Sequence, residues 1–355
     1  SRNQGLRAGL LCLVGARLPR NSLRNCGSPL GKKAKTCPSP TDFPSFSIKN
    51  SAIKSARPIP LSPTSPNSNS CFAFSRKVRR FSHDPHAHRR IQAMIVKPKK
   101  QLGQHFLKDA GTCQKIANQV IWTDQTRKVL EIGPGMGALS KYLWEIPEID
   151  LWLLDVDIES IDYLRAAYPA QAERILFGDF LRLNPAELFG DDAFIVVGNF
   201  PYNISSQILF KCLEHRNQVP QIMGMFQKEV AVRVAQKPGS KEYGIISVLL
   251  QTFYDIHYCF TVDEHVFIPP PKVKSGVIRC VRNERDALPC DEKLYFQVVK
   301  VAFNQRRKTL RNSLRVLLKD APLPAKFEQQ RPERLSVEDF IELTCFIEQL
   351  TANMD

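Results

Sequence analysis

Short apolar runs alternate with helical patterns from about residue 129 to residue 281, and this alternation restricts the fold more than any other feature. Seven runs have the length and composition of buried strands: residues 129–132, 151–155, 174–179, 194–199, 222–227, 245–252 and 276–281. Helical patterns separate most of them, at residues 158–167, 205–215 and 230–236. Strands that alternate with helices indicate a sheet covered on both faces. The expected fold class is therefore α/β, with a mostly parallel, Rossmann-like sheet of seven strands.

The chain divides into three parts by pattern. Residues 1–93 contain 14 Ser and 10 Pro without sustained periodicity, which indicates a disordered leader. Residues 94–284 carry the strand and helix alternation of the main domain. Residues 285–355 lack strand signals, and a long helical pattern at 294–318 indicates a small C-terminal helical domain.

The basic character of the chain is confined to the leader. Residues 1–93 hold 17 Lys and Arg against two acids, whereas residues 94–355 hold 33 bases and 33 acids. Nucleic-acid binding by the folded part must therefore depend on local patches. Two interpretations of the leader stay open: an organelle transit peptide, rich in Arg and Ser, or upstream sequence before a true start at Met94.

The ten cysteines are scattered and form no CxxC pair, so the sequence favours reduced thiols over a zinc site or a disulfide framework. We expect no bound metal. The apolar run at residues 10–14 is too short to cross a bilayer, and no later run is longer, so no membrane partner is expected.

Polar residues and glycines close the expected strands, where ligands bind in open α/β sheets. The first strand runs into Glu131-Ile-Gly-Pro-Gly-Met-Gly137, whose glycines (Gly133 and Gly135 among them) allow a tight turn and a close approach of the backbone to a ligand. Asp155 closes the second strand, 22 residues after Gly133, where a carboxylate can accept both hydrogens of a ribose diol. Asp179 and Asn199 follow the next two. A dinucleotide is the rival ligand, but the glycine spacing differs from GxGxxG. The pattern predicts an adenosyl cofactor without phosphates.

The tetrapeptide Asn199-Phe200-Pro201-Tyr202 is expected to form the reacting centre. It is similar to the Asn/Asp-Pro-Pro-Tyr signature of methyltransferases that act on exocyclic amines. The Asn199 amide oxygen and the Phe200 carbonyl can accept the two hydrogens of an adenine amine, and Pro201 stiffens the loop. Tyr202 can stack on the extruded base, which contributes about 1–3 kcal/mol.

Six motifs together extend this resemblance over residues 97–355. They are Gly103-Gln-His-Phe-Leu107, Glu131-Ile-Gly-Pro-Gly135, Asn199-Phe-Pro-Tyr-Asn-Ile204, Gln227-Lys-Glu-Val230, Phe267-Ile-Pro-Pro-Pro-Lys-Val273 and Phe303-Asn-Gln-Arg-Arg-Lys-Thr-Leu310. In this order they resemble the small-subunit ribosomal RNA adenine N6,N6-dimethyltransferases. The resemblance implies a class I methyltransferase domain with a small C-terminal helical domain. It also implies S-adenosylmethionine as cofactor and two methyl groups on each of two adjacent adenines near the 3′ end of the RNA.

The same resemblance implies the residues that hold the cofactor: His105, Leu107, Gly133, Asp155, Asp179 and Asn199. One position departs from the family, which usually has Glu where this chain has Asp155. The shorter side chain can still bind a ribose, with less reach.

A second group of residues is expected to bind RNA phosphates: Lys97, Lys99, Lys100, Arg306, Arg307, Lys308, Arg311 and Arg315. Between Lys300 and Lys319 there are seven bases and no acid. Arg307, Arg311 and Arg315 are spaced four residues apart, so we expect them to share one face of a helix and to follow RNA phosphates.

Two other functions remain open from sequence. One is a large-subunit RNA methyltransferase of the antibiotic-resistance type, against which the Phe267–Val273 and Arg-rich motifs weigh. The other is a non-catalytic nucleic-acid-binding relative of the mitochondrial transcription factor type, against which the intact Asn199-Phe-Pro-Tyr202 weighs. We expect a monomer that acts on small-subunit RNA or its precursor particle. The expected location is the cytoplasm of a bacterial type of cell, or a plastid or mitochondrion if the leader is a transit peptide.

Overall fold

The computed structural model describes residues 96–319 and 321–352, so the expected leader lies outside the described residues. The strands are β1 (Phe106–Leu107), β2 (Lys128–Ile132), β3 (Asp150–Asp155), β4 (Ile175–Phe177), β5 (Phe194–Asn199), β6 (Gln221–Gln227), β7 (Tyr254–Val262), β8 (Phe267–Ile268) and β9 (Ser275–Arg282). The α-helices are α3 (Ala110–Ala117), α4 (Ser140–Leu143), α5 (Ile158–Ala167), α6 (Pro185–Phe189), α7 (Ser205–Glu214), α8 (Lys228–Ala235), α9 (Ile245–Phe253), α10 (Glu292–Asn304), α11 (Leu310–Ser313), α12 (Arg315–Leu318), α13 (Ala325–Glu328) and α14 (Val337–Ala352). Short 3-10 turns are η1 (Lys100–Leu102), η2 (Pro169–Arg174), η3 (Glu264–Val266) and η4 (Pro332–Arg334).

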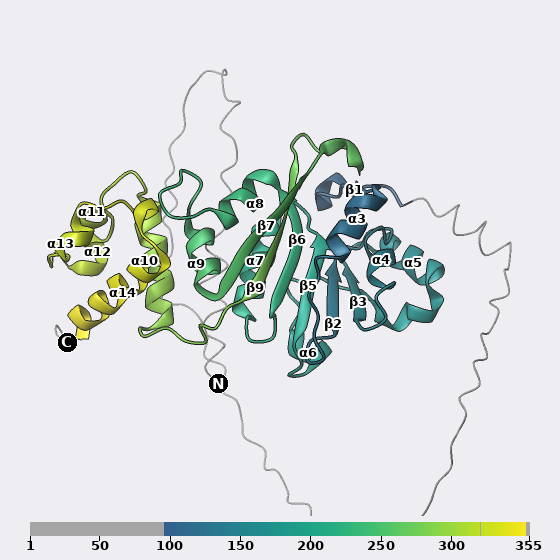
Figure 1. The fold of residues 1–355 in the computed structure, drawn as a ribbon, viewed down its shortest axis with the longest axis horizontal. Coiled ribbons are helices and arrows are strands. Elements are labelled where there is room, and N and C mark those ends of the chain that lie inside the picture. The colour runs from purple at the N-terminus through teal and green to yellow at the C-terminus, as the bar shows by residue number, and fades with distance from the viewer. Residues whose placement is uncertain (1–95, 320, 353–355) are drawn as a thin grey trace, which may run out of the picture. The chain divides into compact units, whose positions relative to one another are not determined.

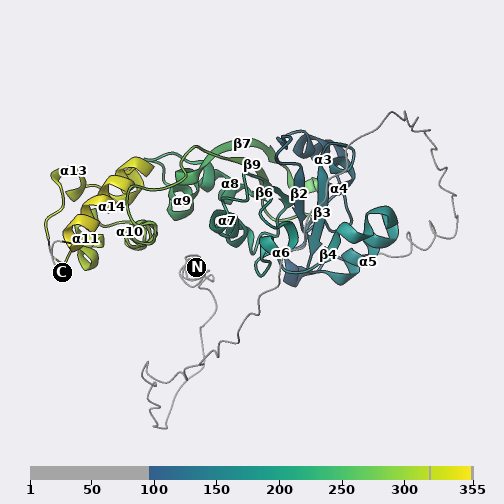
Figure 2. The same ribbon diagram turned by 90° about the horizontal axis from the view of Figure 1, so that it is seen from below.

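Seven strands form one twisted sheet in the order β4-β3-β2-β5-β6-β9-β7 (Figures 1 and 2). The first five are parallel, and β9 runs antiparallel to both β6 and β7. The expected α/β class with a mostly parallel, seven-stranded, Rossmann-like sheet is confirmed. Since β2 to β5 are parallel, their carboxyl ends meet at one edge, where the polar residues that close them lie together.

Both faces of the sheet are buried, which explains why the strands are apolar almost throughout. On β2, Val129 packs in one core cluster with the buried sides of α3, α4 and α5. Its neighbour Leu130 points to the other face and packs in a second cluster with α7, α8 and α9. Each of the two β2 side chains is fully buried, which stabilises the fold by about 1.5–3 kcal/mol per side chain.

The prediction of a strand at residues 245–252 is wrong, because this stretch forms helix α9. Most of its side chains are buried and its composition is mostly apolar, so the stretch resembles a buried strand of similar length. The seventh strand of the sheet is instead β7, which begins directly after the helix. It lies at the edge of the sheet with several exposed polar residues, so it lacks the apolar run by which the other strands were predicted.

The C-terminal residues are helical, as expected, but the single long helix expected at 294–318 is wrong. Helix α10 ends at Asn304, and two one-turn helices, α11 and α12, follow. Helices α10 and α14 contact each other and α9. One apolar cluster runs from the sheet through α9 into these helices, so the division into domains at residue 284 stays a prediction.

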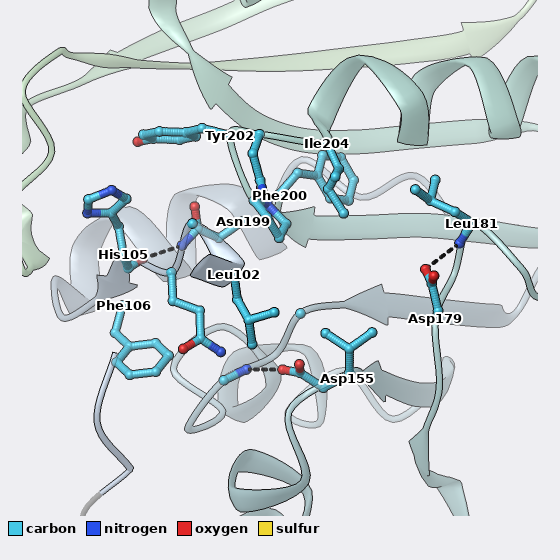
Figure 3. A pocket seen from close by; sticks show the side chains of 17 residues that line it. Leu102, His105, Phe106, Asp155, Asp179, Leu181, Asn199, Phe200, Tyr202 and Ile204 are labelled. Carbon is cyan, nitrogen blue, oxygen red and sulfur yellow. Dashed lines mark hydrogen bonds between the residues drawn. The ribbon is translucent and has the colours of Figure 1, made fainter. Parts of the chain in front are cut away.

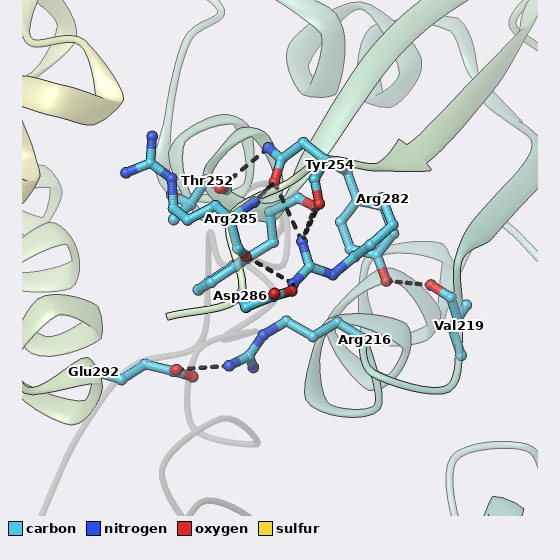
Figure 4. Close-up of polar contacts among 10 residues, drawn as sticks. Arg216, Val219, Thr252, Tyr254, Arg282, Arg285, Asp286 and Glu292 are labelled. Atoms are coloured by element: carbon cyan, nitrogen blue, oxygen red, sulfur yellow. Dashed lines mark hydrogen bonds and ion pairs between the residues drawn. The ribbon is translucent and has the colours of Figure 1, made fainter. Parts of the chain in front are cut away.

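Two arginines, Arg282 on β9 and Arg216 just after α7, hold together the segments around the end of α9 and the start of α10 (Figure 4). The guanidinium of Arg282 donates to the carbonyls of Phe253 and Arg285, at 2.9 and 2.7 Å, and thereby caps the end of α9. Arg216 binds the carboxylate of Glu292 at 2.7 Å. Both guanidinium groups also lie over the Phe253 ring, 4.2 Å (Arg216) and 5.5 Å (Arg282) from its centroid. Charge and stacking therefore fix the start of α10 against the ends of α7 and α9.

No helix within residues 96–319 or 321–352 combines the length and the apolar character needed to cross a membrane.

Candidate active site

A cavity of about 290 Å³ opens at the carboxyl ends of β2, β3 and β5 (Figure 3). Most of the residues expected to bind cofactor or substrate line it: His105, Gly133, Gly135, Asp155, Asp179, Asn199, Phe200, Pro201 and Tyr202. A second cavity of about 240 Å³ lies beside it and shares Phe106, Gly133 and Asn199 with it. Leu107 lines this second cavity, and its side chain is buried in β1.

The glycine turn after β2 is held against Asp155. The Gly135 N–H donates to Asp155 Oδ2 at 3.3 Å, and the Asp157 N–H donates to Oδ1 at 2.9 Å. Gly135 has φ of 55°, and a Cβ there would lie 2.8 Å from the Phe106 ring, so this position requires glycine. Burial raises the pKa of the Asp155 carboxyl to about 6, although these backbone hydrogen bonds oppose the rise.

Asp179 follows β4 and shapes the far end of the cavity. Its Oδ1 accepts from the N–H of Leu181 at 2.9 Å, which forms a tight turn in which Leu181 also lines the cavity. Val156, which directly follows β3, also lines the cavity and is half exposed. Two apolar side chains beside a carboxylate can hold a flat ring with a polar edge.

Glu131 is a site residue that the sequence analysis did not assign, although it directly precedes the glycine turn. Its side chain is buried and lines the second cavity. Burial raises the pKa of its carboxyl to about 8, and the nearby Asp155 carboxylate adds to the effect. The Ser140 hydroxyl is near enough to oppose this rise, but Oε2 makes no hydrogen bond of good geometry with any described residue. A buried oxygen without a partner is costly, and a ligand with a cationic or donor group would satisfy it.

The carboxamide of Asn199 has a defined orientation at the end of β5. Its Nδ2 donates to the backbone carbonyl of His105 at 2.8 Å (Figure 3). A carbonyl can only accept, so the amide nitrogen must face His105 and the amide oxygen is turned the other way. The following Phe200 is buried against Phe226, and its N–H donates to the Met225 carbonyl at 3.2 Å. These contacts hold the loop after β5 on its neighbouring strand.

Tyr202 lies at the mouth of the cavity between two supports. Its ring stacks on the His105 ring with centroids 5.3 Å apart and planes at 27°. Its hydroxyl shares a hydrogen bond of 2.6 Å with Ser275, which is buried in β9. Burial raises the pKa of the Tyr202 phenol. His105 Nδ1 in turn donates to the Pro269 carbonyl at 2.8 Å, so the tyrosine ring is fixed on one face and at its tip.

The basic residues expected to bind RNA differ in their exposure and in their contacts. Lys97, Lys100, Arg307, Lys308, Arg311 and Arg315 have exposed side chains. Lys99 binds Asp157 and Glu159 at 2.6 and 3.1 Å, and Arg311 binds Glu328 at 2.6 Å. Arg306 lies 3.8 Å from Glu333 and donates to the Ser240 carbonyl at 3.3 Å.

The prediction that Arg307, Arg311 and Arg315 share one helical face is wrong. The chain leaves α10 before Arg307, and Lys308 N–H closes a turn on the Gln305 carbonyl at 2.7 Å. Like charges four residues apart repel one another on a helix. Leaving the helix lets Arg306 reach acceptors on other segments, and it places the three arginines on a turn and two separate short helices.

Four further residues support the site and were not assigned from sequence. Gln104 and Asp157 bond to each other, Ser275 holds Tyr202, and Gly224 leaves room for the Phe200 ring. Asp157 could have been recognised as a helix cap. The sequence around Ser275 and Gly224 gives no local signal, since their roles depend on strands paired across the sheet.

Comparison with known proteins gives consistent matches. Residues 95–349 match the family model described as ribosomal RNA adenine dimethylase. A Flavobacterium johnsoniae protein named ribosomal RNA small subunit methyltransferase A is 54% identical over 254 residues, 71% of this chain and 97% of the relative. The Bacteroides thetaiotaomicron protein of the same name is 55% identical over 258 residues, 72% and 96%.

Two solved structures share the fold. A dimethyladenosine transferase from Plasmodium falciparum has a TM-score of 0.59 at 23% identity, covering 70% of this chain and 98% of its own. The 23S rRNA methyltransferase ErmE has a TM-score of 0.51 at 24% identity, covering 68% and 99%. At these identities the likeness concerns the fold.

Proposed function

The chain belongs to the ribosomal RNA adenine dimethylase family, and we propose that it dimethylates the N6 amines of two adjacent adenines near the 3′ end of small-subunit ribosomal RNA. The methyl donor in this proposal is S-adenosylmethionine. Relatives that share more than half of their residues with it carry small-subunit names. They support this substrate over the large-subunit RNA that the sequence left open.

The cavity fits the proposed cofactor at three points. The buried Asp155 carboxylate can accept from a ribose diol. Glu131 Oε2 can accept from an α-ammonium group, which would satisfy that oxygen. Val156 and Leu181 can hold the adenine, with Asp179 at its edge. When bound, the cofactor supplies an electrophilic methyl group on a sulfonium sulfur.

The last residue of β5 and the loop that follows it are proposed to hold the target amine. Asn199 Oδ1 and the Phe200 carbonyl accept its two hydrogens, so its lone pair faces away from them toward the cofactor cavity. Tyr202 stacks on the flipped base. The nitrogen loses its proton to solvent after the new bond has formed, so no strong base is required. Positioning of this kind can lower a barrier by about 7–11 kcal/mol.

The orientation of the Asn199 carboxamide is the observation that carries this proposal. Because Nδ2 is engaged by the His105 carbonyl, the oxygen is the free end of the amide. An acceptor at this position suits an amine donor, and a carboxamide of the opposite orientation would repel it. The same side chain lines both cavities, where cofactor and target would meet.

We propose that the RNA backbone follows exposed lysine and arginine side chains on both sides of the cavity. Lys97 and Lys100 lie on the segment before β1, and Arg307 and Lys308 follow α10. Arg306 holds the loop at Ser240, which brings the exposed Lys237 and Lys241 to the same surface. Lys99 and Arg311 are engaged by carboxylates, so we assign them a smaller part in phosphate binding.

The monomeric state and the location stay proposals. The relatives that are more than 50% identical to this chain are bacterial proteins. They support the prediction of a cytoplasmic location for the part of the chain that they cover. A plastid or mitochondrial location is the alternative if residues 1–93 direct the chain there. A fluorescent protein fused behind those residues distinguishes the two by where it accumulates.

Radiolabelled methyl transfer tests the proposed substrate. The purified chain is incubated with labelled S-adenosylmethionine and either small-subunit or large-subunit ribosomal RNA in matched particles that lack the modification. We expect label only in the small-subunit RNA, on adenine. Label confined to large-subunit RNA would overturn the proposed substrate, and the absence of any transfer would overturn the proposed activity.

A further inference from the structure

The segment from Lys99 to Leu107 crosses the cofactor cavity and supplies part of its wall. Leu102, Gly103, Gln104, His105 and Phe106 all line the cavity. At its far end the segment is fixed by β1, which pairs antiparallel with β8, Phe106 opposite Ile268. Its near end must be fixed by other means, since η1 is a single turn without a side-chain cap.

Three residues fix the near end, and we call them the Asp157 cluster: Lys99, Gln104 and Asp157. Lys99 Nζ binds Asp157 Oδ1 at 2.6 Å, and Gln104 Nε2 donates to Oδ2 at 3.0 Å. Gln104 Oε1 accepts from the Lys99 backbone N–H at 2.8 Å, which closes the ring of contacts. Both oxygens of one carboxylate therefore hold the two ends of a short loop.

Burial distinguishes this cluster from an ordinary surface ion pair. The side chain of Asp157 is 0% exposed, and that of Lys99 is 27% exposed. Burial alone would raise the pKa of the Asp157 carboxyl, yet the hydrogen bonds from Lys99 and Gln104 lower it. Breaking one partner of a buried charge is more costly than breaking an exposed pair.

The cluster also reaches the reacting centre. The residue after Gln104 is His105, whose carbonyl accepts from Asn199 Nδ2 at 2.8 Å. Gly103 lies directly against the loop that follows Asn199, since a Cβ on it would come within 2.8 Å of Asn203 Oδ1. A displacement of this segment would therefore move the group that orients the Asn199 carboxamide.

We propose that Lys99, Gln104 and Asp157 are positioning residues, which hold the segment across the cofactor cavity and orient the Asn199 carboxamide through the His105 carbonyl. The role in orienting Asn199 rests on the proposed function, whereas the role in holding the cavity wall is independent of it. Losing the cluster weakens cofactor binding, because the wall loosens. It also slows transfer at saturating cofactor, because the amide loses its fixed orientation.

A capping role for Asp157 can be separated from the proposed one. Asp157 Oδ1 also accepts from Glu159 N–H at 3.1 Å and so caps α5. Serine is an equally good helix cap but is too short to hold Lys99 and Gln104 as well. Asp157→Ser therefore keeps the cap and removes the cluster. Lys99→Met removes the cation and leaves the cap untouched.

Lys128→Met serves as the matched control. Lys128 binds Asp192 at 2.7 Å and is 30% exposed, close to the values for Lys99, while Asp192 is 69% exposed where Asp157 is buried. It lies at the amino end of β2, at the opposite edge of the sheet from the cavity. The effect of losing a lysine ion pair far from the cavity, in Lys128→Met, is thereby compared with the effect of losing one in the Asp157 cluster, in Lys99→Met.

Three measurements test the inference. Amide hydrogen exchange of residues 102–106, without cofactor, is expected to speed up at least tenfold in Lys99→Met and Asp157→Ser but not in Lys128→Met. The Kd for S-adenosylmethionine is expected to rise roughly tenfold in the same two variants. The kcat for RNA methylation at saturating cofactor is expected to fall by a similar factor.

Unchanged exchange at residues 102–106 would overturn the inference, and so would equal effects in Lys99→Met and Lys128→Met. A raised Kd with unchanged kcat would overturn the link to Asn199. Failure of the proposed function would be recognised separately, because the wild-type protein would then transfer no methyl group while the exchange result could still be obtained.

Discussion

Replacing Asp155 by asparagine should stabilise the empty protein and weaken cofactor binding at the same time. The folded pKa of Asp155 is about 6 and the ordinary value is 3.8. For an acid whose pKa is raised by folding, the free energy of unfolding falls as the pH rises from about 4 to about 6 and stays at the lower value above that window. A difference of roughly two pKa units corresponds to about 3 kcal/mol of lost stability at neutral pH.

Asparagine removes that penalty, because it has no charge to bury. It keeps an oxygen for the Asp157 N–H but loses the 3.3 Å bond from Gly135, which costs about 1 kcal/mol. The net gain at pH 7.5 is about 2 kcal/mol, or an increase in Tm of roughly 4–8 °C. Cofactor binding loses a charge-assisted contact of about 1.5–3 kcal/mol, which raises the Kd more than tenfold.

Thermal melts and calorimetric titration from pH 5 to 7.5 test both effects. As the pH falls to 5, wild-type Asp155 becomes protonated, so the ratio of the variant's Kd to the wild-type Kd should approach one. The difference in Tm should shrink over the same range. A variant that is less stable than the wild type at pH 7.5, or a Kd ratio that does not change with pH, would refute the reasoning.

Three further predictions follow from the site and the surface. Tyr202→Ala should cost about 1–3 kcal/mol in kcat/KM through lost stacking. Tyr202→Phe keeps the ring, so its kcat/KM should change much less, and the loss of about 1 kcal/mol from the unpaired Ser275 hydroxyl should appear in the Tm instead; equal losses of kcat/KM in the two variants would contradict the role of the ring. Arg307→Gln should reduce the slope of log affinity for RNA against log salt by about 0.7–0.9. Arg311→Gln should reduce it by less, because the guanidinium of Arg311 already binds Glu328. Binding isotherms measured over a series of salt concentrations test the difference. A chain that begins at Met94 should melt and bind cofactor like the full chain, because residues 1–93 carry no core-forming pattern; a large drop in Tm would contradict this.

The parallel strands and the residues that close them were predictable from sequence for a physical reason. A buried parallel strand is a short apolar run, and its polar last residue must lie at the ligand-binding edge. Asp155 and Asn199 satisfy both conditions, so their place in the cavity followed from their place in the chain. By the same rule α9 was mistaken for a strand, since a short helix with most of its side chains buried has the same composition as a buried strand.

Contacts between distant segments were beyond the reach of sequence patterns. Lys99 was assigned to RNA because it lies in a run of lysines, but its partner Asp157 is 58 residues away. Ser275 meets Tyr202 across 73 residues. The break after α10 likewise depends on Ser240 and Glu333 as acceptors for Arg306. Each is decided by tertiary packing rather than by local spacing.

The identity and position of the methylated bases test the central claim most directly. Small-subunit RNA treated with S-adenosylmethionine and either the wild-type chain or Asn199→Ala is digested, and its nucleosides and fragments are measured by mass spectrometry. The account predicts two adjacent N6,N6-dimethyladenosines near the 3′ end with the wild type. With Asn199→Ala it predicts a rate lower by on the order of a thousandfold or more, because positioning supplies most of the acceleration. Methyl groups on other atoms or other bases, or an Asn199→Ala rate within a few-fold of the wild type, would contradict it.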